Sequence, residues 1–331
     1  MIRVSCGTAS VLGLSKINIK NNPTTAYLML GDSCNNNCKF CSQGKDSQSN
    51  KNYLSRVNWS IYDDDLIFEN LSTAFRNNHL KRACLQVVNN DSALNNTLST
   101  LKKISAKSNI PICASSTVTN IHQAKELFES GLDRLCVALD VASEKLFNDI
   151  KGKEYEKTKT LLTQLAQNFP YKITTHIIVG LGETQLDLAK TISFLAKADI
   201  TIALFAFTPV RGTVMQKHPK PDLTDYRKIQ LLNYLFQTKR ITLDNLVTDN
   251  DKIIGFKRGD SIDGKIDKNL SLEFKNIILN SKGKAFQTSG CPDCNRPYYN
   301  ETPNETPYNY PYQPTEKEIT NEVNCIDWFR L

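Results

Sequence analysis

The sequence predicts an α/β protein whose core is a (β/α) barrel, TIM-type or partial, followed by an irregular C-terminal segment. Apolar, strand-like runs alternate with amphipathic helical stretches between residues 26 and 250, which is the order of a parallel sheet built from βα units. No Gly-x-Gly-x-x-Gly run follows a strand and opens a helix, which disfavours the alternative, a doubly wound open sheet. After residue 250 the chain becomes polar and then rich in Pro, Tyr and Asn.

These changes divide the chain into three parts. We expect residues 1–25 to be an N-terminal segment, residues 26–250 to form the barrel, and residues 251–331, which contain the pair Cys291 and Cys294, to be a C-terminal auxiliary metal-binding segment. The Pro-rich tail up to residue 314 cannot form a long helix. We expect it to lie extended on the barrel, with its tyrosines as anchors.

The strands are expected where short apolar runs are bounded by polar, Gly or Pro positions. A proline at residue 111 must sit at the beginning of its strand, because it cannot donate to the ladder. The predicted strands are residues 26–31, 83–88, 110–114, 133–139, 171–179, 200–207 and 241–247.

The helices are expected where apolar residues recur three and four positions apart. In the first helix Leu66, Ile67, Leu71 and Phe75 form such a stripe. The predicted helices are residues 61–80, 94–104, 121–128, 155–169, 188–195 and 226–239.

Composition limits the classes of function. The chain has 331 residues, 40% of them hydrophobic and 23% charged. It has no apolar run long enough to cross a membrane and no signal-peptide pattern, so we expect a cytoplasmic protein without a membrane partner. The net charge of +7 could attract an acidic protein partner, although by itself it fits an ordinary solvated surface best. No helix-turn-helix or arginine-rich tract indicates nucleic acid. Ten cysteines favour metal or redox chemistry over disulfides in that compartment.

A cysteine loop follows the first predicted strand directly. Cys34, Cys38 and Cys41 have the spacing C-x3-C-x2-C, with Phe40 before the last cysteine. Three thiolates this close can hold three irons of a [4Fe–4S] cube and leave the fourth iron open. A zinc site is the alternative, but zinc ligands more often come as C-x2-C pairs closed by a further Cys or His, and no His lies near in sequence.

This loop resembles the signature of the radical SAM superfamily. The resemblance implies that the open iron binds S-adenosylmethionine, that one electron cleaves the sulfonium, and that a 5′-deoxyadenosyl radical then abstracts hydrogen from an unactivated carbon. It also implies that Phe40 lies near the adenine. The alternative for Phe40 is simple packing in the core.

Two downstream segments are similar to those of biotin-synthase-related members. Residues 178–184, Ile-Val-Gly-Leu-Gly-Glu-Thr, resemble the motif that ends the fifth strand. There Gly180 would allow close approach of adenine and Glu183 would help to shape the site. By the same resemblance Asp140, at the end of the fourth strand, would approach the ribose. Without the resemblance, Asp140 is a polar strand end and Gly180 a turn residue.

The sequence also departs from biotin synthase. Cys84 and Cys113 fall where two ligands of its [2Fe–2S] cluster would lie, but Thr174 stands at the third place. We therefore expect these two cysteines, and Cys136, to be buried thiols. The usual Gly-Gly-Glu after the second strand is replaced by residues 86–89, Gln-Val-Val-Asn, which leaves the contacts to the methionine amino group open.

Cys291 and Cys294 form a second informative motif. A C-x2-C pair can chelate zinc or an iron–sulfur cluster, whereas a thioredoxin-like pair would require a helix that the following proline and aromatic residues do not extend. Residues 288–301 resemble the C-terminal signature of a group that includes the two-protein, archaeal-type lipoyl synthases. That resemblance implies an auxiliary [4Fe–4S] cluster that supplies sulfur. For its third ligand Cys6 is the first candidate and Cys325 the second; Ser289 could offer an oxygen, and a zinc clip is the alternative.

Two further side chains are candidates for contacts with substrate or cofactor. His176 lies on a strand two residues before Ile178, where it could point into the barrel or be a hydrogen-bonded core histidine. Arg211, after the sixth strand, could bind a carboxylate or phosphate, or lie on the surface.

The resemblance leads to a specific functional expectation: a radical SAM sulfurtransferase that is one component of a lipoyl synthase. It would insert sulfur at C6 or C8 of an octanoyl chain held by a lipoyl carrier domain or H-protein. A second radical SAM protein and an electron donor such as ferredoxin would be partners. The alternatives are biotin-type sulfur insertion, a carbon-skeleton rearrangement, and a non-catalytic iron–sulfur or zinc scaffold.

Overall fold

The chain folds around one large sheet, seen in a computed structural model that describes residues 2–259, 261 and 264–329. Over these residues the sheet has nine strands in the order β3-β4-β1-β2-β5-β6-β7-β8-β9. Six of them, from β2 to β9, are parallel neighbours. Their bounds are β2 Thr25–Leu30, β5 Arg82–Val87, β6 Ile112–Ser115, β7 Arg134–Cys136, β8 Ile173–Val179 and β9 Thr201–Ala206.

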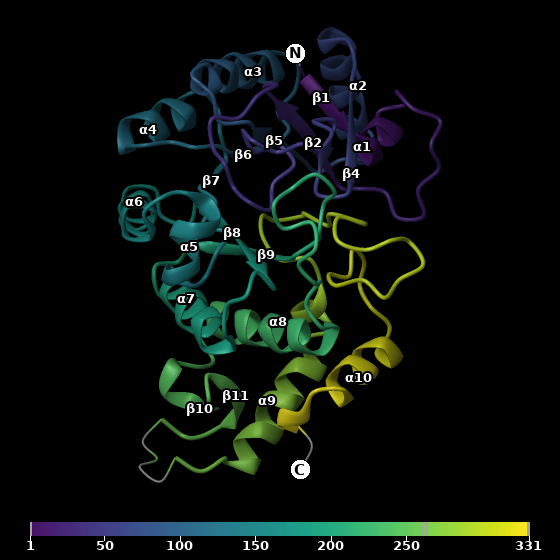
Figure 1. Cartoon of the computed structure of the whole chain (residues 1–331). Helices are drawn as coiled ribbons and strands as arrows, with labels where there is room; N and C mark the ends of the chain where they lie inside the picture. Colours follow the sequence, from purple (N-terminus) through teal and green to yellow (C-terminus); the bar gives the residue numbers. More distant parts are fainter. Residues whose placement is uncertain (1, 260, 262–263, 330–331) are drawn as a thin grey trace.

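Helices cover the outer face of these parallel strands (Figure 1). The prediction of an α/β partial barrel is confirmed, because side chains from both β2 and β9 face one cavity inside the curled sheet. The covering helices are α2 Asp64–Arg76, α3 Ala93–Lys107, α4 Ile121–Glu129, α5 Glu144–Lys151, α6 Tyr155–Asn168, α7 Gln185–Lys197 and α8 Leu223–Gln237.

Local sequence explains where these helices begin. Asp63 caps α2 by accepting the backbone N–H of Leu66, and Thr184 forms a capping box with Asp187 at the start of α7. The cap at Asp63 corrects the predicted start of the first helix, since residue 61 ends strand β4, Val57–Ile61. Leu66 is correspondingly 44% exposed rather than part of the buried stripe.

The N-terminal segment contributes an antiparallel extension of the sheet that periodicity alone did not predict. Strand β1, Ile2–Ser5, pairs antiparallel with both β2 and β4. Helix α1, Cys6–Val11, follows at once, and the short strand β3, Tyr53–Leu54, forms a hairpin with β4. This part of the sheet therefore adjoins the first parallel strand.

The last predicted strand, residues 241–247, is wrong as a strand of the parallel sheet. A 3₁₀ turn at Leu243–Asn245 interrupts it, and β10, Leu246–Asp249, pairs antiparallel with β11, Lys252–Phe256. Asn250 and Asp251 both have positive φ, as the two-residue turn of a tight hairpin requires. The turn directs β10 into this hairpin, away from the barrel edge (Figure 1).

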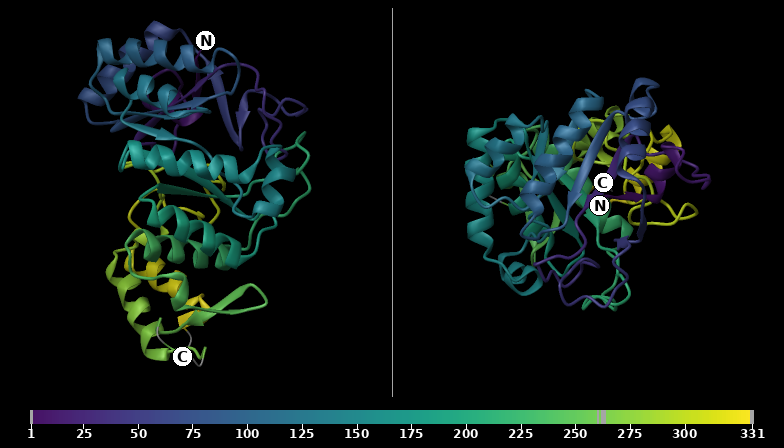
Figure 2. Two further views of the ribbon diagram at one scale, coloured as in Figure 1. Left: turned by 90° about the vertical axis from the view of Figure 1, so that its left-hand side faces the viewer. Right: turned by 90° about the horizontal axis from the view of Figure 1, so that it is seen from above.

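The C-terminal region is less irregular than expected. It contains two helices, α9 Lys268–Asn280 and α10 Glu316–Asn324, with 3₁₀ turns at Lys284–Phe286 and Asp327–Phe329. Figure 2 shows these helices and the hairpin gathered at one end of the molecule. Within the described ranges, no helix is long and apolar enough to cross a membrane.

A buried ion pair attaches α10 to α8. The Nε of Arg227 donates to Glu322 at 2.8 Å, and the Arg227 side chain is inaccessible to solvent. The same guanidinium also donates to the carbonyls of Pro307 and Tyr308. One side chain of the barrel thus holds both the C-terminal helix and the extended tail.

Residues 288–301, which we call the closing segment, lie along the open edge of the curled sheet. The Ser289 hydroxyl accepts the N–H of Leu204 at 2.9 Å, and the Asn300 amide donates to Ala206 at 2.6 Å. On the other side, Asn295 accepts the N–H of Thr24, directly before β2, at 2.9 Å. The closing segment therefore pairs the polar groups of edge strand β9 and bridges from β9 to β2.

Candidate functional site

The cysteine loop between β2 and β3 is anchored by groups from several elements. Arg3, on β1, donates to the carbonyl of Gly31 at 2.6 Å and to the side chain of Gln43 at 3.3 Å, so it holds both ends of the loop. The N–H of Asn35 bonds the carbonyl of Asn89 at 2.6 Å. These contacts place the loop at the C-terminal ends of the strands, where barrel enzymes carry their chemistry.

The three loop cysteines line a cavity of about 220 Å³ at this rim, which we call the rim cavity. Phe40 and Asp140 also line it. Burial raises the pKa of the Cys38 thiol, and raises that of Cys41 to about 12. Three sulfur donors on one short loop beside an open cavity fit an iron–sulfur cluster with one free iron.

Asp140 does not present a free carboxylate. Its Oδ2 lies 2.6 Å from the Nζ of Lys151, and both side chains are almost fully buried. Asp140 also has a φ of 64°, in the left-handed region that Asp tolerates better than most residues. Burial acts to lower the pKa of Lys151, but the Asp140 carboxylate raises it above its usual value. The residue expected at the ribose is thus already half of an ion pair. The sequence held no signal for its partner.

Gly180 and Glu183 lie in one turn after β8, and neither lines the rim cavity. The Glu183 carboxylate accepts the N–H of Gly180 at 2.7 Å and of Leu181 at 2.9 Å. Gly180 has a φ of 98°, and a Cβ there would lie 2.9 Å from Pro221. Their direct role in this structure is to shape the turn after β8.

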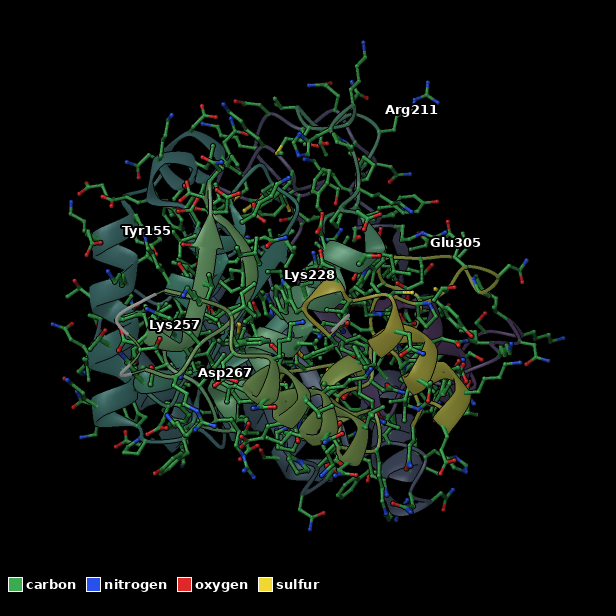
Figure 3. All side chains as sticks on the ribbon, turned by 90° about the horizontal axis from the view of Figure 1, so that it is seen from below. Tyr155, Arg211, Lys228, Lys257, Asp267 and Glu305 are labelled. Carbon is green, nitrogen blue, oxygen red and sulfur yellow. The ribbon has the colours of Figure 1, made fainter. Side chains whose placement is uncertain are left out.

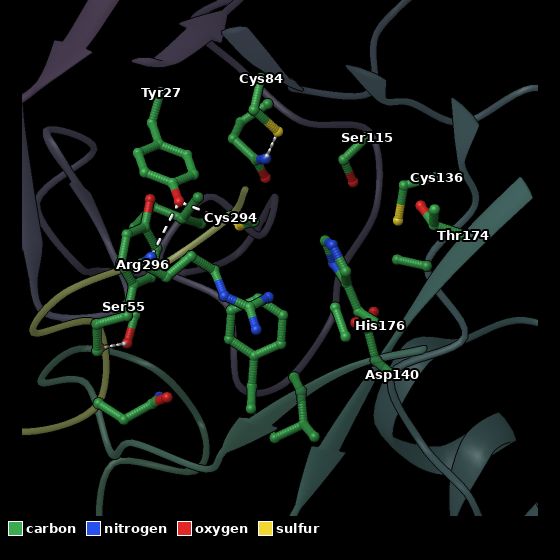
Figure 4. A pocket seen from close by; sticks show the side chains of 18 of the residues that line it. Tyr27, Ser55, Cys84, Ser115, Cys136, Asp140, Thr174, His176, Cys294 and Arg296 are labelled. Atoms are coloured by element: carbon green, nitrogen blue, oxygen red, sulfur yellow. Dashed lines mark hydrogen bonds between the residues drawn. The ribbon is translucent and has the colours of Figure 1, made fainter. Parts of the chain in front are cut away.

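A second cavity, of about 270 Å³, lies inside the curled sheet; we call it the inner cavity. It shares Phe40, Cys41 and Asp140 with the rim cavity, so the two spaces adjoin. Its lining is mainly apolar, which suits a substrate with an alkyl part. Figure 4 shows Tyr27, Cys84, Cys294 and Arg296 on one side of this cavity and Cys136, Thr174 and His176 on the other.

Cysteines from two distant parts of the chain meet in the inner cavity. Cys84 and Cys113 line it from β5 and β6, and Cys291 and Cys294 line it from the closing segment. The Tyr27 hydroxyl lies 3.2 Å from the sulfur of Cys294. Cys113 is buried, as expected, whereas Cys84 is only partly buried, and both face the same space as the C-terminal pair.

Neither of the two cysteines expected as a third auxiliary ligand lines the rim cavity or the inner cavity. Cys6 begins α1 and packs, partly buried, against an apolar cluster that includes Met29 and Trp59. Cys325 is exposed after α10. Ser289 is hydrogen-bonded to β9, as described above. Among the described residues, no three or more His, Cys, Asp or Glu side chains are arranged to hold a single metal ion.

Two basic side chains were candidates for ligand contacts. His176 lines the inner cavity against Phe205, with 5.0 Å between ring centroids, and burial lowers its pKa to about 4. Arg211 is exposed on a surface loop (Figure 3). Instead Arg296, which sequence reasoning missed, lies in the cavity with its guanidinium 4.0 Å from the Phe205 centroid.

Comparison with known proteins identifies the family of this chain. Residues 28–195 match the family described as the Radical SAM superfamily. A biotin synthase of Leptospira biflexa is 26% identical over 61% of this chain and 55% of its own length. A lipoyl synthase of Chlamydia caviae is 26% identical over 61% of this chain and 65% of its own length. The chain thus spans under two thirds of each curated relative.

One solved structure supports the fold. The crystal structure of methylornithine synthase aligns with a TM-score of 0.52 at 12% sequence identity, covering 71% of this chain and 68% of that one. At this identity the likeness concerns the partial barrel alone.

Proposed function

Because the chain belongs to the radical SAM superfamily, we propose that it is a sulfur-insertion enzyme, specifically one component of a lipoyl synthase. Its substrate would be an octanoyl chain held by a lipoyl carrier domain or H-protein, with sulfur inserted at C6 or C8. Relatives named biotin synthase and lipoyl synthase support sulfur insertion as the class of reaction.

One observation carries this proposal: the inner cavity is lined both by the cysteine loop and by the C-terminal cysteine pair. Phe40 and Cys41 line it from the loop, and Cys291 and Cys294 from the closing segment. A carbon that receives sulfur must reach a hydrogen-abstracting group and a sulfur source from one bound position. A single, mainly apolar cavity that is lined by cysteines of both motifs meets that requirement.

The residues of this chain have separable tasks in such a reaction. Cys34, Cys38 and Cys41 would hold a [4Fe–4S] cluster, and Phe40 would pack beside the bound S-adenosylmethionine. The cluster and S-adenosylmethionine held there would supply the radical chemistry that removes hydrogen from the substrate carbon. The buried cavity walls exclude water from a reactive carbon.

Cys291 and Cys294 would bind an auxiliary [4Fe–4S] cluster. A cluster held there would supply the sulfur for the insertion. Arg296, against Phe205, keeps positive charge near these thiols. The proposal therefore assigns the two cysteine motifs to different halves of one reaction.

The partners follow from the substrate. A carrier domain, a second radical SAM protein and an electron donor such as ferredoxin would dock on this chain. Its net charge of +7 favours attraction to an acidic carrier.

The decisive experiment is an anaerobic incubation with an octanoylated carrier, S-adenosylmethionine, reductant and the second radical SAM protein. Mass spectrometry of the carrier peptide should show the added mass of sulfur together with 5′-deoxyadenosine. The Cys38→Ala variant is the matched control. Formation of 5′-deoxyadenosine without any sulfur on the carrier would contradict the lipoyl proposal, and absence of both products would favour the scaffold alternative.

A second candidate is biotin-type sulfur insertion into a free small molecule, favoured by the relatives named biotin synthase. Against this candidate, Thr174, which has no thiol, stands where the third ligand of the cluster used in that reaction would lie. The same incubation with the small-molecule precursor of biotin in place of the carrier distinguishes the two candidates.

A further inference from the structure

The pairing of β5 with β6 places two cysteines side by side. Cys84 lies opposite Cys113 in the parallel register of these strands. Because side chains alternate between the two faces of a strand, register partners point to the same face. Both side chains line the inner cavity, so the barrel wall itself presents a pair of thiols.

The closing segment presents its own pair from a tight turn. The N–H of Cys294 bonds the carbonyl of Cys291 at 3.2 Å, and Asp293 between them has a φ of 62°. Arg82, at the start of β5, donates to the carbonyl of Pro292 at 3.2 Å. Thr24, just before β2, donates to the carbonyl of Asp293 at 2.5 Å. These bonds hold the turn against the N-terminal ends of the strands.

The two pairs of thiols are in contact. The Cys113 thiol lies close enough to both Cys291 and Cys84 for these thiols to raise its pKa, while the hydroxyl of Tyr27 lies 3.2 Å from the sulfur of Cys294. Tyr27 in turn is the register partner of Cys84 on β2. Barrel wall and closing segment therefore converge on one group of four sulfurs.

The surroundings of this group are suited to negative charge. Arg82, Arg134 and Arg296 all act on Cys291 as nearby positive charges. Four thiolates around a cluster inside the sheet would require such compensation, since charge removed from water without a partner is costly. Arg82 is also paired with Asp133 at 2.5 Å and is 5% exposed, so its position is well defined.

We propose that Cys84, Cys113, Cys291 and Cys294 together hold the auxiliary iron–sulfur cluster, a [4Fe–4S] cube, at the closed end of the inner cavity. The inference rests on the proposed function and deepens it by assigning the ligands. In a [4Fe–4S] cube each iron takes one thiolate, so the four sulfur ligands lie at four separate corners. They do not surround one point, as the ligands of a single metal ion do. Cys6 and Cys325 are then not ligands.

This assignment has a structural consequence. Two ligands belong to barrel strands and two to the closing segment, so the cluster would tie residues 288–301 to the barrel wall. Metal binding that joins distant parts of a chain contributes directly to folding stability. Removal of the cluster should therefore loosen the closing segment while leaving the parallel sheet intact.

The test isolates this site by removing the other one. In a Cys34→Ala/Cys38→Ala/Cys41→Ala background, anaerobic reconstitution should give about four irons and about four sulfides per chain, with iron–sulfur absorption. Adding Cys84→Ser, Cys113→Ser, Cys291→Ser or Cys294→Ser should each lower bound iron by at least about half. Cys6→Ser and Cys325→Ser are the matched controls and should leave the iron unchanged.

A second readout does not depend on any substitution. Chelation of iron from the unsubstituted protein should increase hydrogen exchange in residues 288–301 at least about threefold, with β5 and β6 remaining protected. No iron in the triple-alanine background, zinc in place of iron, or loss of iron with Cys6→Ser but not with Cys84→Ser would each overturn the assignment. Iron held by the four cysteines without sulfur transfer would instead count against the proposed function and leave this site standing.

Discussion

Lys151 and Asp140 form a buried ion pair at the rim, with 2.6 Å between Nζ and Oδ2. The lysine ends α5, and the aspartate lies just beyond β7. The ammonium also donates to the carbonyls of Ala138 and Leu139. The pair therefore connects a helix end to the strand end that borders both cavities.

Replacing Lys151 alone should be strongly destabilising. Lys151→Met leaves the Asp140 carboxylate buried without a partner, which should lower the free energy of unfolding by about 3 kcal/mol. Asp140→Asn combined with Lys151→Met should recover part of that loss. Urea denaturation of the apo-protein measures both. Lys157→Met, which breaks an exposed pair with Glu154, is the control and should change little; an equally small effect of Lys151→Met would contradict the prediction.

Glu183 should stabilise the turn after β8. Glu183→Ala leaves the N–H groups of Gly180 and Leu181 without their acceptor, at a cost of about 1–3 kcal/mol. Faster hydrogen exchange at these two amides and a lower melting temperature should follow. Glu129→Ala, on the exposed end of α4, serves as the comparison. Unchanged exchange at residues 180 and 181 would argue against this role for Glu183.

His176 should make stability dependent on pH. Burial lowers its pKa to about 4, below the ordinary value, so between these two pKa values the unfolded chain binds more protons than the folded one. Stability should therefore rise with pH across this window and level off above about 6.5, with a gain of about 2 kcal/mol from pH 5 to 7.

The matched substitutions test that sign. His176→Asn should flatten this part of the stability curve of the apo-protein, whereas His122→Asn, at an exposed helix position, should not. A stability that falls from pH 5 to 7 only when His176 is present would show the opposite shift.

Arg227 should anchor the C-terminal helix. Arg227→Met removes the partner of Glu322 and of the carbonyls of Pro307 and Tyr308, and should cost about 3 kcal/mol. Because these contacts hold α10 and the tail, limited proteolysis should cut near residues 308–324 earlier than in the parent protein. Lys125→Met, in an exposed pair with Glu129, is the control. Unchanged cleavage there would mean that other contacts hold α10.

Cys38 should be needed for cleavage of S-adenosylmethionine. Cys38→Ala removes one of the three thiolates on the loop, so bound iron should fall by about four per chain and 5′-deoxyadenosine should no longer form. Cys325→Ala removes an exposed thiol that lines neither cavity and serves as the comparison. Retained 5′-deoxyadenosine formation by Cys38→Ala would contradict the assignment of the loop.

The sequence predicted the βα alternation and the cysteine loop because both are local signals. Side-chain periodicity reports which faces of a segment are apolar, and the loop cysteines lie within eight consecutive residues, Cys34 to Cys41. The same local logic failed at residues 241–247, where a tight hairpin competed with the barrel edge.

The tertiary structure decided how groups that are far apart in the chain come together. The sequence identified Cys84, Cys113, Cys291 and Cys294 separately, but only the register of β5 with β6 and the path of the closing segment bring them into one cavity. The sequence also identified Asp140 as a candidate site residue, but not Lys151, its ion-pair partner. Local patterns determine which helix or strand each segment forms. Which faces of two distant segments come into contact depends on how the chain between those segments packs.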